Sequence, residues 1–473
     1  MSQLILFAAL HVLGVAICMA VGPWQRIWLC NALGFAVGLA GMVFVYLGVL
    51  LVGVSHVGVT IALYAALLGT CVYSTVKRQR WNRSTIQAAL VGALGFATLC
   101  FPFCNWNFSS FSYDSHMFVM YGRAIGADGQ LTLDMLQQLD KWGMFQVVAH
   151  AMCAFVKQDY LYGLAPAFAV SMLATFVVTL GEALAEMRVE KRHRVLWVCL
   201  VVAVLLAIPL FRFHVIYIHS NMGSAGYLLF FVALFWLAEV KNDPSYLPLA
   251  FLSLLSFTVL RVEASPYSIA FLVVTVLDSR LPRQILLRWY AVYTGFLVAW
   301  FGLLALNVPA DSVYLTPTKC LLFATGFAML FAYWLLKDRP VIRLVTRHLI
   351  SLTLLACVLG IIAAGVTHGD NMRESASIWL GDLWRSPWWA SIWKLVAILT
   401  VVGLFVPAPP MCQRFVLSVW LFFGLTLIIS STGTAFGPDI DGSLIRMTIH
   451  ILPVVLFYGA LKFAPLLSAE RAR

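Results

Sequence analysis

The feature that most constrains the fold is a series of long apolar runs along the whole chain. A helix of about 20 apolar residues crosses the ~30 Å hydrocarbon core of a bilayer. We expect spans at 3–22, 28–52, 56–76, 85–104, 158–184, 194–212, 223–240, 246–260, 264–279, 285–307, 317–336, 345–367, 390–407, 413–431 and 447–465. The pattern predicts an all-α fold, a polytopic transmembrane helical bundle of about 13–15 spans with juxtamembrane helices on its outer face. Residues 1–473 are expected to form a single integral membrane domain.

The composition excludes several classes of protein. Hydrophobic residues make up 62% of the chain and charged residues 11%, whereas a soluble domain carries about 25% charged residues. A soluble enzyme, a fibrous protein and a disordered chain are therefore excluded. The formal net charge of +11 is explained by the excess of Lys and Arg in cytoplasmic loops of membrane proteins, so we expect membrane lipid and no nucleic acid as a partner.

The basic residues also predict an orientation in the membrane. The tight clusters lie within 77–80, 188–194, 280–283 and 337–347. They share one side if spans alternate strictly and if 142–157 does not cross the membrane. We therefore expect an N-terminus outside, a cytoplasmic C-terminus and a multi-pass protein of the bacterial inner membrane. The outer loops are then 105–157, 213–222, 368–389 and 432–446.

The outer loop 105–157 contains the most informative polar residue, Asp114. A helix is expected from Asp114 to Gly126, because apolar residues from Met117 to Ile125 recur at helical spacing. A second short amphipathic helix is expected after Thr132, with Leu133, Leu136 and Leu139 on its apolar face. Asp114 at the helix start serves as an N-cap or as a general base for an acceptor hydroxyl. His116 is a neighbouring hydrogen-bonding residue.

Other ionisable or polar side chains lie at the outer ends of later spans. Ionisable residues at membrane depth usually face a partner or a cavity, and arginine matches phosphate oxygens with parallel donors. The candidates, grouped along the chain, are His214 with His219 and Asn221, Arg261 with Glu263, and Arg446 with His450. Together they indicate a lipid-phosphate site. Two alternatives stay open: a structural ion pair for Arg261 and Glu263, and an interfacial anchor for Arg446.

No motif points to a cofactor or a metal. The cytoplasmic loops contain no Gly-rich phosphate-binding motif, and the cysteines show no CxxC spacing. We therefore expect neither a cofactor nor a metal ion. Trp379, Trp384, Trp388 and Trp389 in the loop 368–389 are typical of an aromatic belt at the membrane interface, with a sugar-stacking platform as the alternative.

The order of these parts resembles the GT-C class of polyprenyl-phosphate-sugar-dependent membrane glycosyltransferases. The resemblance rests on Tyr113-Asp114-Ser115-His116 leading into amphipathic helices, and it covers the layout of residues 85–280. It implies a glycosyltransferase in which Asp114 is the catalytic base and in which some of His219, Arg261 and Arg446 bind the lipid phosphate. The donor would be a lipid-linked sugar on an isoprenoid phosphate, and the acceptor a glycan or a lipid.

Two other functions remain open at this point. A lipid-linked polysaccharide polymerase or ligase also works on the outer face, but it typically depends on arginines in one large late loop, and 368–389 holds only Arg373 and Arg385. A lipid or solute transporter should carry polar residues at mid-membrane depth in several spans. Here the spans are nearly free of charge and polar residues gather at their outer ends, which favours an enzyme.

Overall fold

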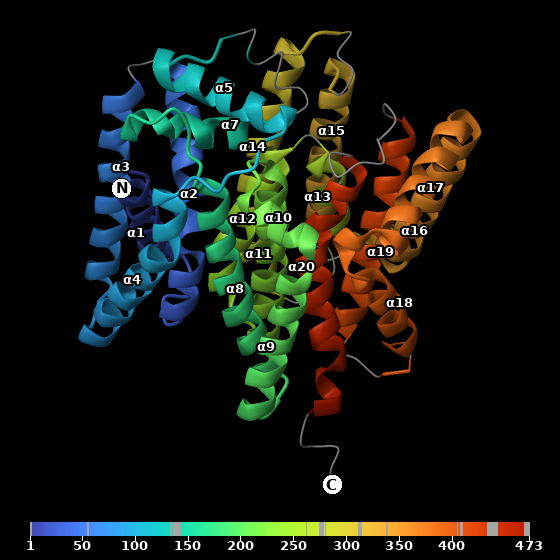
Figure 1. The fold of residues 1–473 in the computed structure, drawn as a ribbon. Helices are drawn as coiled ribbons and strands as arrows, with labels where there is room; N and C mark the ends of the chain where they lie inside the picture. The colour runs from blue at the N-terminus through green and yellow to red at the C-terminus, as the bar shows by residue number, and fades with distance from the viewer. Residues whose placement is uncertain are drawn as a thin grey trace. The chain divides into compact units, whose positions relative to one another are not determined.

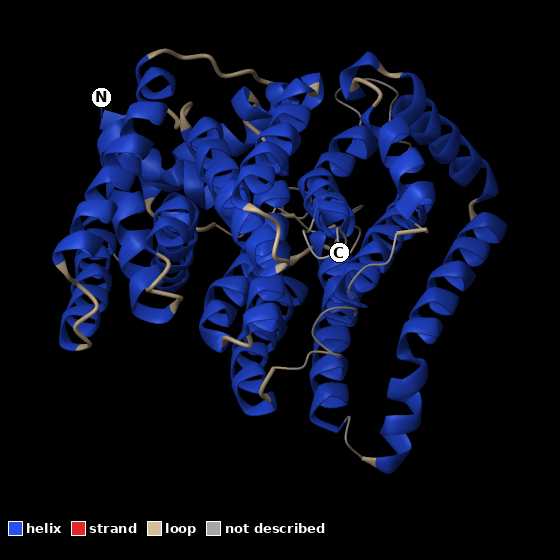
Figure 2. Ribbon diagram, turned by 90° about the horizontal axis from the view of Figure 1, so that it is seen from below, coloured by secondary structure: helices blue, strands red, loops and turns tan. Residues whose placement is uncertain are grey.

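The computed structural model is helical throughout the part of the chain that it describes. That part comprises residues 2–53, 56–132, 135, 143–261, 263–273, 279, 281–310, 315–336, 339–403, 405–406, 410–432 and 443–467. Within these ranges the chain forms helices joined by loops, and no strand is present (Figure 2). Nine of the described helices are long and apolar enough to cross a membrane, or up to eleven if each of two bent helix pairs is one span. This fits a multi-pass membrane protein and a helical bundle.

The helices fall into two compact units, and each is described by itself. The first comprises residues 1–180, 213–238 and 245–261. It contains α1 (Ser2–Val21), α2 (Ile27–Val52), α3 (His56–Lys77), α4 (Arg83–Asn105), α5 (Tyr113–Asp128), α7 (Met144–Ala151), the 3-10 turn η1 (Met152–Val156), α12 (Leu247–Leu260) and the larger parts of α8 (Leu164–Glu186) and α11 (Ser220–Lys241).

The second unit comprises residues 181–212, 239–244 and 262–473. Its helices are α9 (Lys191–Ala207), α13 (Ala264–Phe271), α14 (Arg283–Asn307), α15 (Pro317–Leu336), α16 (Pro340–Thr367), α17 (Gly369–Arg385), α18 (Ile392–Gly403), α19 (Pro410–Thr432) and α20 (Ser443–Phe463). The short helix α10 (Pro209–Ile216) begins in this unit and ends in the first. The expectation of one domain over 1–473 stays a prediction.

Most expected spans coincide with helices, and three segments differ. α8 begins at Leu164, six residues after the expected start, since 158–163 forms turns that bond to the N-terminus of the chain. The expected span 194–212 is broken at Ile208, because Pro209 has no N–H to continue the helix. The segment 368–389, expected as a loop, contains the helix α17, which is bent from α16 by 116°.

Several expectations fall in segments outside the described residues. These are most of the second amphipathic helix, with Leu133, Leu136 and Leu139, and the larger part of the loop 432–446. The end of the expected span 264–279 also lies outside them beyond residue 273, apart from Ser279. Those expectations stay predictions.

Close glycine contacts bring α1 and α2 together in the first unit. A Cβ added to Gly14 of α1 would lie 1.7 Å from the carbonyl oxygen of Gly34, and one added to Gly38 of α2 would lie 1.8 Å from that of Leu10. Gly34 and Gly38 are four residues apart on one helix face, the spacing at which small residues let membrane helices approach closely. The two backbones therefore touch along this seam, with no room for a side chain.

The two ends of α1 meet different parts of the first unit. At its start, the side-chain amide of Gln3 donates to the carbonyl oxygen of Tyr160 and accepts from the N–H of Gly163. At its other end, Arg80 donates to the carbonyl oxygens of Met19 and Ala20. The chain start therefore lies at the same end as the turns that follow 105–157, and the basic cluster 77–80 lies at the opposite end. The side that faces the cytoplasm stays a prediction.

α5 and α7 run across the direction of α1–α4 at one end of the first unit (Figure 1). α7 has 8 residues, which at 1.5 Å per residue is far shorter than the ~30 Å needed to cross a bilayer. η1 continues this apolar segment to Val156, and the whole segment Met144–Val156 is shorter than the helices long enough to cross a membrane. The expectation that 142–157 does not cross stays a prediction. Gly122 and Gly126 of α5 let the two helices pack closely, because a Cβ at either would lie within 3 Å of His150 or Ala151 of α7.

We predict that Gly38→Ala destabilises the folded protein. Its new methyl group would meet the backbone of α1, which cannot rotate away, and overpacking of this kind costs about 1–3 kcal/mol. The melting temperature of the purified protein in detergent should fall. Gly48→Ala in the same helix is the matched control, since nothing lies within 4 Å of its added Cβ. Equal melting temperatures for the two variants would show that the seam tolerates a side chain.

We also predict a pH dependence of stability that arises from His150. Its side chain is buried in α7, and burial lowers the pKa of this imidazole from 6.5 to about 4. Between these pH values the unfolded chain binds a proton that the folded chain does not, so stability falls as the pH falls from 6.5 toward 4. His150→Gln should flatten this part of the melting-temperature profile relative to the unchanged protein. A variant profile as steep as that of the unchanged protein would contradict this assignment.

Candidate functional site

Asp114 lies in the first turn of α5, and the helix is capped by another residue. The side chain of Ser112 accepts from the N–H of Ser115, while the hydroxyl of Ser115 accepts from the N–H of Ser112. This reciprocal capping box makes Ser112 the N-cap, so the N-cap interpretation of Asp114 is wrong. Because Ser112 caps the helix, the Asp114 carboxylate is not used as a cap and can bond to residues outside α5. Its negative charge is stabilised by the dipole at the N-terminus of the helix.

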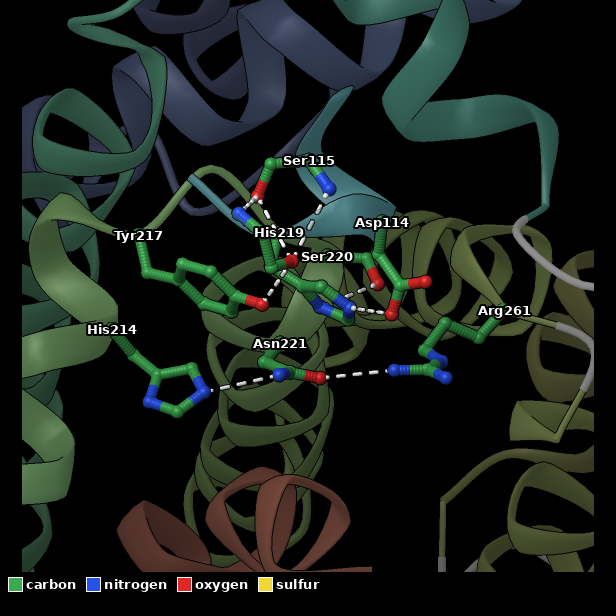
Figure 3. A network of polar contacts seen from close by, with 9 residues as sticks. Asp114, Ser115, His214, Tyr217, His219, Ser220, Asn221 and Arg261 are labelled. Atoms are coloured by element: carbon green, nitrogen blue, oxygen red, sulfur yellow. Dashed lines mark hydrogen bonds and ion pairs between the residues drawn. The ribbon is translucent and has the colours of Figure 1, made fainter. Parts of the chain in front are cut away.

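The carboxylate of Asp114 meets His219, which directly precedes α11. The distance from Nε2 of His219 to Oδ2 of Asp114 is 3.2 Å (Figure 3). Both residues are buried, with 2% of His219 and 7% of Asp114 exposed. The imidazole is held between two rings: it stacks on Tyr217 at 5.3 Å and meets the edge of Phe118 at 5.5 Å. The pair is therefore fixed in place and largely shielded from water.

A short backbone pairing brings these two segments together. Ser110 donates its N–H to the carbonyl oxygen of Ile216 and accepts from the N–H of Ile218. The hydroxyl of Tyr217 in turn donates to the side chain of Ser112, the cap of α5. The residues before α5 and before α11 are thus joined by main-chain and side-chain hydrogen bonds. This junction holds the two segments in the relative position that places Asp114 beside His219.

A second chain of hydrogen bonds runs through Asn221 (Figure 3). Nη1 of Arg261 donates to Oδ1 of Asn221 at 3.0 Å, and Nδ2 of Asn221 lies 3.0 Å from Nε2 of His214. A guanidinium has only donors, so the amide oxygen must face Arg261 and the amide nitrogen must donate to His214. Nε2 of His214 is consequently an acceptor, which makes this imidazole neutral with its proton on Nδ1.

The structure brings together five of the candidate residues and separates the others. The five that share one end of the first unit are Asp114, His214, His219, Asn221 and Arg261. The side chain of His116, by contrast, is exposed on α5. The remaining three belong to the second unit: Glu263 is half-buried before α13, His450 is buried in α20, and the side chain of Arg446 lies outside the described part of the chain.

A small pocket of about 20 Å³, room for roughly one water molecule, adjoins the Asp114–His219 pair and is partly open to solvent. It lies within the first unit and is lined by Leu39, Phe145, Gln146, Leu164, Ala165, Phe168, His219, Met222, Gly223, Tyr227 and Leu260. Sequence reasoning missed Gln146 and Tyr217. Gln146 could have been found from its spacing to His150, since two polar residues four positions apart in an apolar helix lie on the same face.

The chemistry available at this site is proton transfer and anion binding. A buried carboxylate fixed by an imidazole can accept a proton from a bound hydroxyl. Arg261 contributes a buried guanidinium, the group whose parallel N–H donors match the geometry of phosphate oxygens. Among the described residues, no three His, Cys, Asp or Glu side chains lie close enough together to hold a metal ion.

We predict that Asn221→Leu destabilises the first unit. The substitution removes the acceptor of a buried guanidinium and the donor to His214, and an unmade buried hydrogen bond costs about 1–3 kcal/mol. Asn221→Asp should be better tolerated, since its carboxylate still accepts from Arg261. Thermal melting in detergent measures both. Asn307→Leu is the control, because the amide of Asn307 donates to Leu303, one turn back in its own helix. Equal melting temperatures for Asn221→Leu and Asn307→Leu would contradict the prediction.

Comparison with known proteins assigns no family to the chain. The resemblance to GT-C glycosyltransferases stays a prediction, and any function must rest on the residues of the site. No protein family model matches the chain, and neither a curated protein nor a solved structure is similar to it.

Proposed function

We propose that this protein is an integral membrane glycosyltransferase. It transfers a sugar from an isoprenoid-phosphate donor to a glycan or lipid acceptor on the extracytoplasmic face of the bacterial inner membrane. The observation that carries the proposal is the buried contact between Asp114 and His219 in the same compact unit as Arg261. A transfer from a lipid phosphate needs both a base for the acceptor and a cation for the leaving group.

The proposed reaction uses each of these residues once. Asp114, oriented by His219, takes the proton from the acceptor hydroxyl as its oxygen attacks the anomeric carbon. The bond between that carbon and the phosphate oxygen breaks, and the configuration at the carbon is inverted. The isoprenoid phosphate leaves with the electron pair, and Arg261, held by Asn221, stabilises its negative charge.

Burial supports these roles. Arg261 is 5% exposed, and in such a medium of low dielectric its attraction for a developing phosphate charge is stronger than in water. The hydrogen bond from His219 holds the Asp114 carboxylate before the acceptor arrives, so little reorganisation accompanies the reaction. The roles in substrate binding that the sequence predicts for His116, Glu263, Arg446 and His450 stay predictions.

We predict that Asp114→Asn lowers sugar transfer by about 10²–10⁴-fold, the usual contribution of a positioned base. The readout is transfer of radiolabelled sugar from a polyprenyl-phosphate donor, with the full-length protein in vesicles. Asp128→Asn at the exposed end of the same helix is the matched control, and it should transfer normally. Full transfer by a folded Asp114→Asn protein would refute the role of Asp114.

The same assay distinguishes the alternatives. A polymerase or ligase would transfer preassembled lipid-linked chains in place of single sugars. A transporter would move the labelled lipid between leaflets without cleaving the bond between the sugar and the phosphate. That bond would then stay intact with the unchanged protein and with Asp114→Asn alike. Reporter fusions at Asp128 and at Arg194 test the orientation, since we expect an external signal from the first and a cytoplasmic signal from the second.

A further inference from the structure

We propose that the basic end of the first unit binds the phosphate headgroup of an anionic phospholipid. This end is formed where α1 and α3 finish and where α2 and α4 begin. Its cations, which all lie at or between these helix ends, are Arg26, Lys77, Arg78, Arg80 and Arg83. The inference does not depend on the proposed function, because Asp114 follows the other end of α4.

The charges of this part of the chain are all of one sign. No Asp or Glu precedes Asp114 in the sequence, so neither α1–α4 nor the loops that join them contribute an acidic side chain. An anion that binds at the basic end is therefore attracted by several cations, and clusters of this kind at the end of membrane helices attract anionic lipids.

Two guanidiniums converge at this end. Nη1 of Arg78 and Nη1 of Arg80 both donate to the carbonyl oxygen of Ala20, at 3.4 and 3.0 Å. Arg80 is half-buried over the ring of Trp24, with Cζ 5.6 Å from the ring centroid, whereas Arg78 is exposed. Burial and the nearby charge of Arg78 lower the pKa of the Arg80 guanidinium. The two cations therefore repel each other, and a phosphate beside them relieves this repulsion.

The surroundings of the cations favour a lipid over a soluble anion. Large apolar side chains are exposed next to them, Tyr73 and Val76 near the end of α3 and Ile86 and Leu90 near the start of α4. Trp28 at the start of α2 is 55% exposed, and tryptophan is typical of the membrane interface. A phosphate at the cations thus leaves the acyl chains to pack along α3 and α4.

The charge of the site also distinguishes between phospholipids. A zwitterionic headgroup such as phosphocholine brings its own cation toward the arginines, whereas phosphatidylglycerol brings a phosphate and neutral hydroxyls. Lys77, Arg78 and Arg83 are exposed, so their charges face the region in which a headgroup lies. The basic end therefore favours the anionic lipid.

The first test measures lipid binding to the full-length protein in a neutral detergent by native mass spectrometry. Arg78→Gln combined with Arg83→Gln removes two exposed cations and leaves Arg80, which bonds to the last turn of α1, unchanged. Dioleoyl phosphatidylglycerol should bind the unchanged protein more tightly than dioleoyl phosphatidylcholine. The double variant should bind phosphatidylglycerol about 25-fold more weakly, since each cation near a membrane surface contributes about fivefold.

Lys191→Gln combined with Arg192→Gln is the matched control, because it removes the same net charge from two exposed cations of another basic segment. An equal loss of phosphatidylglycerol binding in both double variants would overturn the proposal in favour of a general attraction to the positive protein. Equal binding of the two lipids to the unchanged protein would also overturn it. Binding of glycerophosphoglycerol, the headgroup without acyl chains, as tight as that of the whole lipid would overturn the assignment to a lipid.

The second test locates the lipid in vesicles that contain equal amounts of phosphatidylglycerol and phosphatidylcholine. The photoreactive residue benzoylphenylalanine replaces either Val76 or Val195, which are each 57% exposed and each lie beside a basic segment. Cross-links from position 76 should contain more phosphatidylglycerol than those from position 195. Adding Arg78→Gln and Arg83→Gln should remove this excess. Equal lipid proportions at the two positions in the otherwise unchanged protein would overturn the proposal.

Discussion

The arrangement of the site depends on how the first unit accommodates the charge of Arg261. A guanidinium cannot lose its proton inside a protein and offers only donors, so it requires an acceptor that stays in place. Asn221 supplies that acceptor at 3.0 Å. The orientation of the Asn221 amide then determines the tautomer of His214, because the amide nitrogen must donate to Nε2 of that ring. One buried charge therefore sets the hydrogen-bond direction through three side chains, which come from α10, from α11 and from the residue that ends α12.

The same part of the protein depends on the junction of two loops. The backbone pairing of Ser110 with Ile216 and Ile218 joins the start of α5 to the start of α11, and it brings Asp114 to His219. α5 in turn packs on α7 through Gly122 and Gly126, and α7 carries Gln146, which lines the same small pocket as His219. Asp114, His219 and Arg261 thus each lie at or next to a helix terminus, where the chain changes direction.

Local sequence patterns predict the helices well, because a span in lipid must be both apolar and helical. The expected spans 28–52, 56–76 and 317–336 agree with α2, α3 and α15 to within a residue. The break at Pro209 and the capping box of Ser112 and Ser115 were also readable from the sequence, since both depend on neighbouring residues. The bonds of Asn221 to Arg261 and of Asp114 to His219 were not, because they join residues 40 and 105 positions apart and arise from tertiary packing.

The distribution of polar groups in the first unit bears on the choice between an enzyme and a carrier. Asp114, His214, His219 and Arg261 all lie at or near helix termini. Within the described spans of this unit, His11 is the one histidine or charged residue far from a helix end, and its ring stacks on Phe96 at 4.5 Å in a buried position. A carrier must offer its substrate polar contacts at mid-membrane depth. A single imidazole packed against a phenyl ring is a poor candidate for a path that carries a charged substrate, whereas the polar cluster at one end of the helices contains the groups that the proposed reaction uses.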